Sequence, residues 1–378
     1  MFIKEKSMKT KKRIIVGMSG GVDSSVTAAL LLEQGHDVVG LFMRNWDSLL
    51  NNDLEGNSNQ DICPQEQDYL DALAVCKKLN IPLERIDFIK EYWDDVFTYF
   101  LDEFKKSRTP NPDILCNKYI KFNAFLKYAR NQLQADYIAM GHYARIIYHK
   151  ETKQYQLLKG TDDSKDQSYF LCQLNQDQLQ YSMFLLGNKT KVEVRKLALT
   201  YDLPTAKKKD STGICFIGNR NFQTFLANYL PAKTGDIVDI NTKKTIGSHH
   251  GVYYYTIGQR RGINLSGMKM PYFVVAKDVA NNILYVANDN ETKWLMANSC
   301  TVSDINWISK DKISKNINCF AKFRYRQPDV AVTINVVNDN EFKVTFSQPM
   351  RAVTPGQSAV FYDGDICLGG GVINEVFR

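Results

Sequence analysis

The chain has 378 residues, of which 44 % are hydrophobic and 24 % are charged, and its formal net charge is +7. This length exceeds one typical core, so we expect two or three domains of a soluble globular protein. No apolar run approaches the roughly 18 residues of a membrane-spanning helix, and the basic start at 1–13 lacks a signal-peptide core. The sequence thus argues against a membrane protein and predicts a cytoplasmic one.

Cysteine and histidine usage argues against a resident metal. The eight cysteines are dispersed, without a C-x-x-C pair, and there are only five histidines. Without a secretory signal we expect the thiols to be reduced at rest. The mild positive charge does not by itself indicate nucleic acid.

Strand and helix patterns alternate through the first 200 residues. Short apolar runs predict strands at 13–18, 37–43, 83–88 and 137–141. Helical spacing predicts helices at 26–32, 67–80, 91–106 and 118–133, and the polar stretch 51–61 predicts an exposed loop. Repeated βα units predict a Rossmann-like parallel sheet with helices on both faces, which binds ligands at the carboxyl ends of its strands.

After about residue 218 the pattern changes to short alternating runs separated by turn residues. This pattern predicts two small all-β modules with a break near residue 290. We therefore divide the chain into an α/β catalytic domain at 1–217, a small β-rich central domain at 218–289 and a C-terminal β-barrel at 290–378.

The loop "SGGVDSS" joins the first strand to the first helix. Gly20 and Gly21 allow close backbone approach, Ser24 and Ser25 supply hydroxyls, and the helix N-terminus attracts anions. Asp23, in the first helical turn, is a candidate Mg²⁺ ligand beside phosphate oxygens. The loop lacks the lysine of a Walker A motif, which favours pyrophosphate as a departing group over transfer of a γ-phosphate.

"SGGVDS" resembles the signature of the N-type ATP pyrophosphatases, which cleave ATP to AMP and pyrophosphate while adenylating a carbonyl oxygen. The resemblance implies that ATP, with Mg²⁺, is bound at this loop and at two further positions. The implied residues are Gly17, Met18, Ser19, Gly20, Gly21, Val22, Asp23 and Ser24 in the loop, with Met43 and Gly141 at the adenine and ribose.

Two cysteines stand apart from the others by their context. Cys116 follows the proline-rich "TPNPDIL" and is expected to open a helix, whose N-terminus would lower the pKa of the thiol. Cys215 lies in a Ser/Thr/Gly loop behind three lysines at 207–209, which is also an electropositive setting. The other six cysteines lie in apolar or amphipathic runs and are expected to be small buried side chains.

Taken together, "TPNPDILCN", "DSTGICFIG", "GHYA", "KDQSYFL", "YTIGQRRG" and "FRYRQ" closely resemble the tRNA-specific 2-thiouridylases over nearly the whole chain. The resemblance implies that the C2 oxygen of the wobble uridine is adenylated and then replaced by sulfur. Cys215 would carry a persulfide, Cys116 would act as the nucleophile, and Asp113 would be a candidate acid/base. Either route of sulfur transfer leaves the two cysteines as a disulfide.

The same resemblance implies contacts with the anticodon region of tRNA, whose unpaired base is easily turned out. The "RYR" run combines phosphate donors with a stacking ring, which favours RNA binding on the residues alone. Arg260 and Arg261 of "GQRRG" and the triple lysine are further basic candidates. The implied contact residues are Asn111, Pro112, Asp113, His142, Lys165, Asp166, Gln167, Arg324, Tyr325 and Gln357.

Two alternatives stay open at this point. Another N-type pyrophosphatase, such as an amidating or a lysidine synthetase, would share the loop but would not need two thiols. A non-catalytic RNA-binding protein could use the same cysteines as a redox switch. A thiouridylase also needs a sulfur donor protein, either a cysteine desulfurase or a relay protein, which the sequence does not identify.

Overall fold

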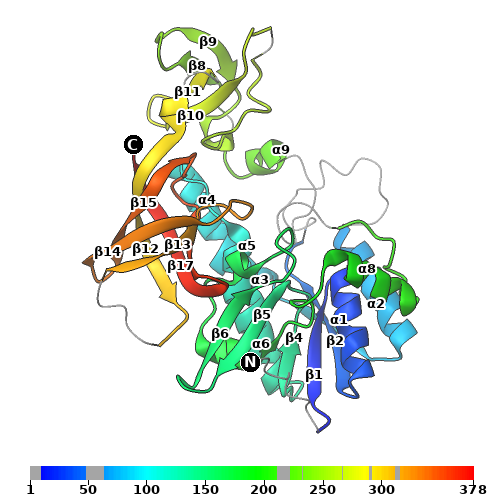
Figure 1. Cartoon of the computed structure of the whole chain (residues 1–378). Helices are drawn as coiled ribbons and strands as arrows, with labels where there is room; N and C mark the ends of the chain where they lie inside the picture. Colours follow the sequence, from blue (N-terminus) through cyan, green and yellow to red (C-terminus); the bar gives the residue numbers. More distant parts are fainter. Residues whose placement is uncertain are drawn as a thin grey trace.

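A parallel sheet forms the first part of the fold in the computed structural model, which describes residues 10–47, 64–210, 222–231, 233–265, 267–288, 292–310 and 316–378 (Figure 1). Within these residues the strand order is β3-β2-β1-β4-β7. β1 pairs in parallel with β2 on one side and β4 on the other, which places the carboxyl ends of β1 and β4 side by side. The strands are β1 (Arg13–Met18), β2 (Asp37–Arg44), β3 (Leu83–Asp87), β4 (Tyr137–Ala139) and β7 (Ser182–Met183).

Helices cover both faces of this sheet, and the alternating side chains of β1 pack into two separate hydrophobic cores, one on each face. Ile14 and Val16 pack with α1, α2 and α8, whereas Ile15 packs with the helices between β3 and β4. On the first face lie α1 (Val22–Glu33), α2 (Pro64–Leu79) and α8 (Lys191–Thr200). On the second lie α3 (Ile89–Tyr92), η1 (Trp93–Phe97), α4 (Thr98–Lys105), α5 (Pro112–Leu115), η2 (Cys116–Ala124) and α6 (Phe125–Asn131).

A four-stranded sheet in the order β10-β11-β8-β9 forms the middle module, at the top of Figure 1. Its alternating pattern buries residues such as Ile237 and Val286. The sequence predicted strands here, and the module also begins with a helix. Its elements are α9 (Phe222–Ala227), β8 (Gly235–Asp239), β9 (Thr245–His249), η4 (Val252–Tyr254), β10 (Tyr272–Asp278) and β11 (Ile283–Asn288).

The C-terminal strands close into a barrel, because β12 pairs with both β15 and β17. The described strands run in the order β12-β15-β14-β13-β16-β17. The elements are η5 (Thr292–Leu295), β12 (Met296–Trp307), β13 (Ile317–Lys322), β14 (Val330–Asn338), β15 (Glu341–Arg351), β16 (Ser358–Asp363) and β17 (Ile366–Phe377). The parallel sheet, the β-rich module and the barrel confirm the predicted fold class.

A hairpin from the first half of the chain extends the barrel wall, which the sequence analysis did not foresee. β5 pairs with β6, and Leu157 and Leu158 of β6 pair with Cys367 and Ile366 of β17. Two short helices follow the hairpin in the chain and lead back to β7 of the parallel sheet. These elements are β5 (Ala144–His149), β6 (Gln154–Lys159), η3 (Ser168–Leu171) and α7 (Gln176–Gln180).

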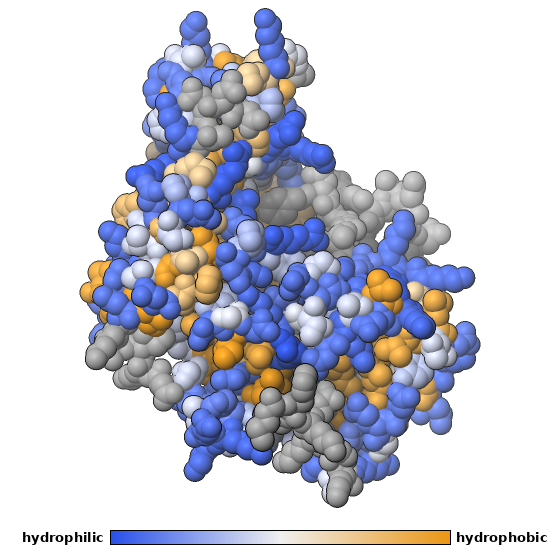
Figure 2. Space-filling model, in the orientation of Figure 1, coloured by the Kyte–Doolittle hydropathy of each residue, from blue (hydrophilic) through white to orange (hydrophobic). Residues whose placement is uncertain are grey.

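One apolar core joins the three parts. It extends from Phe97 and Phe125 beside the parallel sheet to Val274 in the middle module and Tyr362 in the barrel wall. On the outside, polar side chains cover most of the face drawn in Figure 2, and apolar ones form small scattered groups. Among the described residues no helix is long and apolar enough to cross a membrane.

Candidate active site

The glycine loop leaves the N-terminus of α1 open to an anion. Gly21 is the N-cap residue and no side chain caps the helix within the described residues. The hydroxyl of Ser24 accepts from the Ser19 N–H at 3.2 Å and donates to the Gly21 carbonyl, which fixes the shape of the loop. The first N–H groups of α1 therefore stay available, as an anion cradle requires.

Two glycines are needed where the loop meets its neighbours. Gly20 has φ +68°, and a Cβ atom placed there would lie 2.2 Å from the carbonyl oxygen of Asp68 in α2. At Gly141, just after β4, a Cβ atom would lie 2.9 Å from the backbone of Asp23 and Ser24. The structure thus brings Gly141 against the loop, because β1 and β4 are neighbours in the sheet.

Asp23 is held by two side chains from distant parts of the chain. Lys191, the first residue of α8, donates to both carboxylate oxygens at 2.7 and 2.8 Å. The Tyr143 hydroxyl donates to Oδ1 at 2.8 Å. Burial, together with the charge of Asp23, raises the pKa of Tyr143, so this hydroxyl keeps its proton.

A second carboxylate, Asp210, gathers three cations next to the loop. It accepts from Lys165 at 2.8 Å, from Lys191 at 2.9 Å and from Arg195 at 2.5 Å. Burial alone would raise the pKa of Asp210, but the hydrogen bonds and charges of Lys165 and Lys191 outweigh it and hold the pKa well below its usual range. Three cations and the carboxylates of Asp23 and Asp210 therefore lie together at this side of the loop.

One member of the triple lysine has a structural role. Lys208 donates to the Gly20 carbonyl at 3.0 Å and forms ion pairs with Asp68 and Asp71 of α2. It therefore ties the glycine loop to α2. Lys207 and Lys209 are exposed, as a solvated charge run predicts.

Cys116 is fully buried and lies one turn inside its helix. Cys116 is the first residue of η2, but α5 precedes it and continues into η2 without a break, so the helix N-terminus lies at Pro112, with Asn111 as its cap, and not at Cys116 as expected. The Cys116 N–H already donates to the Pro112 carbonyl, so it is not among the open N–H groups. Since the dipole effect falls off within the first turn, it acts on this thiol less than expected.

The remaining described cysteines are all buried, as predicted. Burial raises the pKa of Cys76, Cys172 and Cys319 to about 12 and shifts Cys300 and Cys367 in the same direction. Such thiols stay protonated near neutral pH and are poor nucleophiles. Cys63 and Cys215 lie outside the described residues.

The segment before Cys116 docks on the barrel. The Gln357 side-chain amide donates to the Thr109 carbonyl at 2.8 Å, and the Thr109 N–H donates to the Pro355 carbonyl. Asn111, two residues on, accepts from the N–H groups of Asp113 and Ile114. The structure therefore places Gln357 beside the segment of Asn111, Pro112 and Asp113.

The segment 165–167 is bound tightly into the fold. The Asp166 carboxylate is buried and accepts from Gly160 and Ser168 N–H groups, both at 3.0 Å. Gln167 accepts from the Tyr143 N–H and is thereby linked to the residue beside Asp23. Lys165 reaches Asp210, so this segment forms part of the charged side of the loop.

Arg324 and Tyr325 lie where the barrel meets the other modules. Arg324 Nη2 donates to the Ile257 carbonyl of the middle module at 2.8 Å and to the Ala352 carbonyl of the barrel at 3.0 Å. The Tyr325 ring packs on Phe170 with centroids 4.4 Å apart. Both side chains are half-buried, whereas neighbouring Arg326 is exposed.

His142 and Met43 are buried at the carboxyl ends of β4 and β2. The His142 ring lies between Phe122 and Phe184, with centroids 5.7 and 5.6 Å away. Burial, and to a lesser extent the charge of Lys121, lowers the pKa of His142 well below its usual value, so the ring is neutral at neutral pH. In the described part of the chain its Nδ1 has no hydrogen-bond partner.

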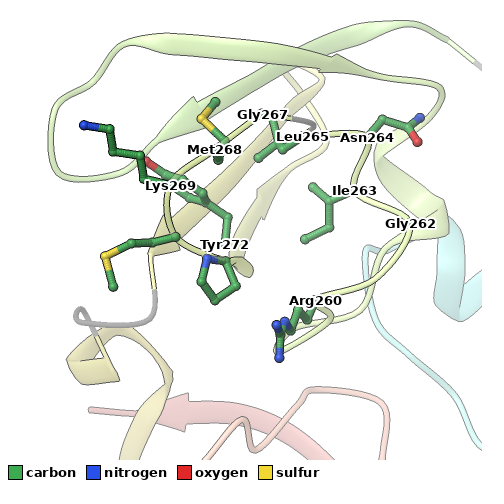
Figure 3. A pocket seen from close by; sticks show the side chains of 11 residues that line it. Arg260, Gly262, Ile263, Asn264, Leu265, Gly267, Met268, Lys269 and Tyr272 are labelled. Carbon is green, nitrogen blue, oxygen red and sulfur yellow. The ribbon is translucent and has the colours of Figure 1, made fainter.

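A pocket of about 690 Å³ lies in the middle module, away from the glycine loop (Figure 3). Arg260 lies at its edge toward the barrel, and Lys269 extends from a different side. Together with Arg261 they give this surface a positive charge, which agrees with the basic run noted in the sequence.

Comparisons with known proteins agree with this architecture. Family models described as "tRNA methyl transferase HUP domain", "tRNA methyl transferase PRC-barrel domain" and "Aminomethyltransferase beta-barrel domain" match residues 12–219, 223–288 and 297–373. The tRNA-specific 2-thiouridylase MnmA of Mycoplasma capricolum is 62 % identical over 374 residues, which cover 97 % of this chain and all of that protein. The chain belongs to the tRNA-specific 2-thiouridylase family.

A relative from another bacterial genus supports the same family. The 2-thiouridylase MnmA of Staphylococcus carnosus is 51 % identical over 366 residues, covering 97 % of this chain and 96 % of that protein. A solved U34-tRNA thiolase from Methanococcus maripaludis is 17 % identical, with a TM-score of 0.33 over 54 % of this chain and 61 % of that one, which is too weak a likeness to carry an argument. The family resemblance predicted from the motifs is confirmed, and the alternative synthetases are not favoured.

Sequence reasoning missed Lys191 and Tyr143. Both contact Asp23, but they lie 168 and 120 residues away along the chain, so no local pattern joins them to it. One signal was present for Lys191. It is the first residue of a helix and lies between Thr190 and Glu193, which form the capping box. A cation at a helix N-terminus opposes the helix dipole unless a carboxylate compensates it.

Proposed function

We propose that this chain is a tRNA 2-thiouridine synthase that uses ATP to replace the C2 oxygen of the wobble uridine with sulfur. Membership of the 2-thiouridylase family carries the proposal, and the open anion cradle before α1 supports the use of ATP. The uracil oxygen is a poor leaving group. When this oxygen bonds to the α-phosphorus of ATP, pyrophosphate leaves and the N3 proton is lost to water, and AMP then becomes the leaving group instead.

Sulfur delivery is assigned to two cysteines. In one route the terminal sulfur of a Cys215 persulfide attacks C2 and displaces AMP, and the Cys116 thiolate then attacks the inner sulfur to release the thionucleoside. In the other, Cys116 attacks the inner sulfur first and releases sulfide, which attacks C2. Both routes leave a Cys116–Cys215 disulfide, and a reductant must supply two electrons to restore the thiols.

Asp113 and the metal complete the proposed chemistry. Asp113 lies three residues before Cys116 in the same helix and is a candidate acid/base. Asp23 fits Mg²⁺ as a hard oxygen ligand beside the phosphate cradle, and in this structure it is paired with Lys191 and Tyr143. When bound there, the metal would neutralise charge on the phosphates.

Reconstitution tests the proposal. Purified chain, ATP, tRNA, cysteine and a cysteine desulfurase should yield thionucleoside, detected by retardation in mercury gels, with AMP and pyrophosphate formed in equal amounts. A tRNA with cytidine at the wobble position is the matched control and should stay unmodified. Thionucleoside formed at the same rate without ATP would contradict the mechanism.

Two arginines of the "RYR" run, Arg324 and Arg326, distinguish contacts with tRNA from contacts within the fold. Because Arg324 bridges the Ile257 and Ala352 carbonyls, Arg324→Ala should lower the melting temperature by a few degrees. Arg326 is exposed, so Arg326→Ala should leave the melting temperature unchanged and reduce the salt slope of tRNA binding by about 0.9 if it contacts one phosphate. An unchanged slope in Arg326→Ala would remove that residue from the RNA surface.

A further inference from the structure

Lys191 is a nearly buried cation at the side of the glycine loop. Only 13 % of its side chain is exposed. Its ammonium group donates to both oxygens of Asp23 and pairs with Asp210 at 2.9 Å. It is held there by the backbone as well, because the Lys191 N–H donates to Asp162 at 2.9 Å.

This position is electrostatically costly without a negative partner. Lys191 is the first residue of α8, where the helix dipole is positive, and burial removes most of the water around the ammonium group. Lys165 and Arg195 bring two further positive charges to the same carboxylate, Asp210. The carboxylates of Asp23, Asp162 and Asp210 balance these three positive charges, so the phosphates of an incoming nucleotide must replace a carboxylate at the ammonium group of Lys191.

We propose that Lys191 binds the β- and γ-phosphates of ATP and then the pyrophosphate that leaves. This inference rests on the proposed use of ATP. The loop contains no lysine of its own. Lys191 instead contacts Asp23 in the first turn of α1, the helix whose open N–H groups form the anion cradle. It supplies from α8 the cation that a Walker A loop carries within itself.

The chemistry explains why a cation is needed at this position. When the uracil oxygen bonds to the α-phosphorus, the bond between that phosphorus and the bridging oxygen breaks, and its electron pair ends on pyrophosphate. An ammonium group next to the departing oxygens stabilises this charge more in the transition state than in ATP. Lys191 acts here as a catalytic residue that touches the leaving group.

Binding also requires an exchange of partners. In this structure Lys191 is occupied by Asp23, so phosphate oxygens must compete with that carboxylate. When Lys191 turns to the phosphates, Asp23 keeps its hydrogen bond from the Tyr143 hydroxyl, and its carboxylate can then bind a cation. The ion pair therefore holds both groups in place before the nucleotide arrives.

Calorimetric titration of the full chain with pyrophosphate, with and without Mg²⁺, tests this assignment. Lys191→Met should weaken pyrophosphate binding by about 10- to 150-fold, the range for a lost charge-assisted hydrogen bond. Lys191→Arg should recover part of the affinity. Lys196→Met is the matched control, since Lys196 is exposed on the same helix, and it should bind as the wild type does.

A second variant keeps the test decisive if Lys191→Met does not fold. Asp23→Asn removes the competing carboxylate, so it should raise the metal-free affinity for pyrophosphate several-fold, whereas a purely structural ion pair predicts a loss. Equal affinities of Lys191→Met and wild type, or no gain in Asp23→Asn, would overturn the assignment. If the wild type itself binds neither ATP nor pyrophosphate, the proposed function fails instead.

Discussion

Replacing Cys116 with alanine is expected to reduce thionucleoside formation by about 10³-fold or more, while ATP binding stays within about twofold of the wild type. Neither route of sulfur transfer can yield free thionucleoside without this thiolate, because in each the Cys116 thiolate must attack the inner sulfur of the Cys215 persulfide. The anion cradle lies in a separate loop and is not altered by the substitution. Thionucleoside is measured by mercury-gel retardation, and ATP binding by calorimetry.

Two further variants separate the role of Cys116 from a general effect of losing a buried thiol and from the role of Cys215. Cys172→Ala is the matched control, because Cys172 is also fully buried and burial raises the pKa of its thiol to about 12. It should lose some stability and keep its activity per folded molecule. Cys215→Ala should fail to take up labelled sulfur from the desulfurase, whereas Cys116→Ala should still take it up. Thiolation by Cys116→Ala at a tenth of the wild-type rate would contradict the assigned role.

The features that the sequence predicted best are those that depend on neighbouring residues. The open N-terminus of α1 could be predicted from consecutive residues alone: a β-branched strand, then "SGGVDS", then an apolar helix. The sequence also placed Gly141 and the loop at one edge of a parallel sheet, but their contact depends on β1 and β4 being neighbours, which only the structure shows. These inferences needed only the spacing of the apolar residues and the order of strands and helices along the chain, not the positions of side chains.

Features that depend on distant residues were missed. The hairpin β5–β6 joins the barrel through β17, more than 200 residues later, and nothing in its own sequence indicates that partner. The "RYR" run also did not indicate that Arg324 Nη2 donates to carbonyls of two modules, because both carbonyls come from distant parts of the chain. The contact of this run with RNA stays a prediction.

The error at Cys116 has a local cause. Proline is favoured in the first turn of a helix and asparagine is a favoured cap, so "NPD" marks a helix start four residues before the helix that we expected. We took these residues as a turn because each of them is also common in turns. The cap hydrogen bonds of Asn111 distinguish the two possibilities, and only the structure provides them.

Substituting alanine at Gly20 should reduce ATP affinity by about 100-fold or more, because the added Cβ atom would lie 2.2 Å from the Asp68 carbonyl oxygen and must push the loop away from α2. A side chain at positive φ also lowers the stability of the fold, and Gly364→Ala measures that loss of stability by itself. Gly364 has φ +55°, and a Cβ atom there would meet nothing within 4 Å. Gly364→Ala should therefore lose a little stability and no ATP affinity. Calorimetric titration with ATP and thermal unfolding separate the two effects. If Gly20→Ala bound ATP as tightly as the wild type does, the close contact between the loop and α2 would not shape the nucleotide site.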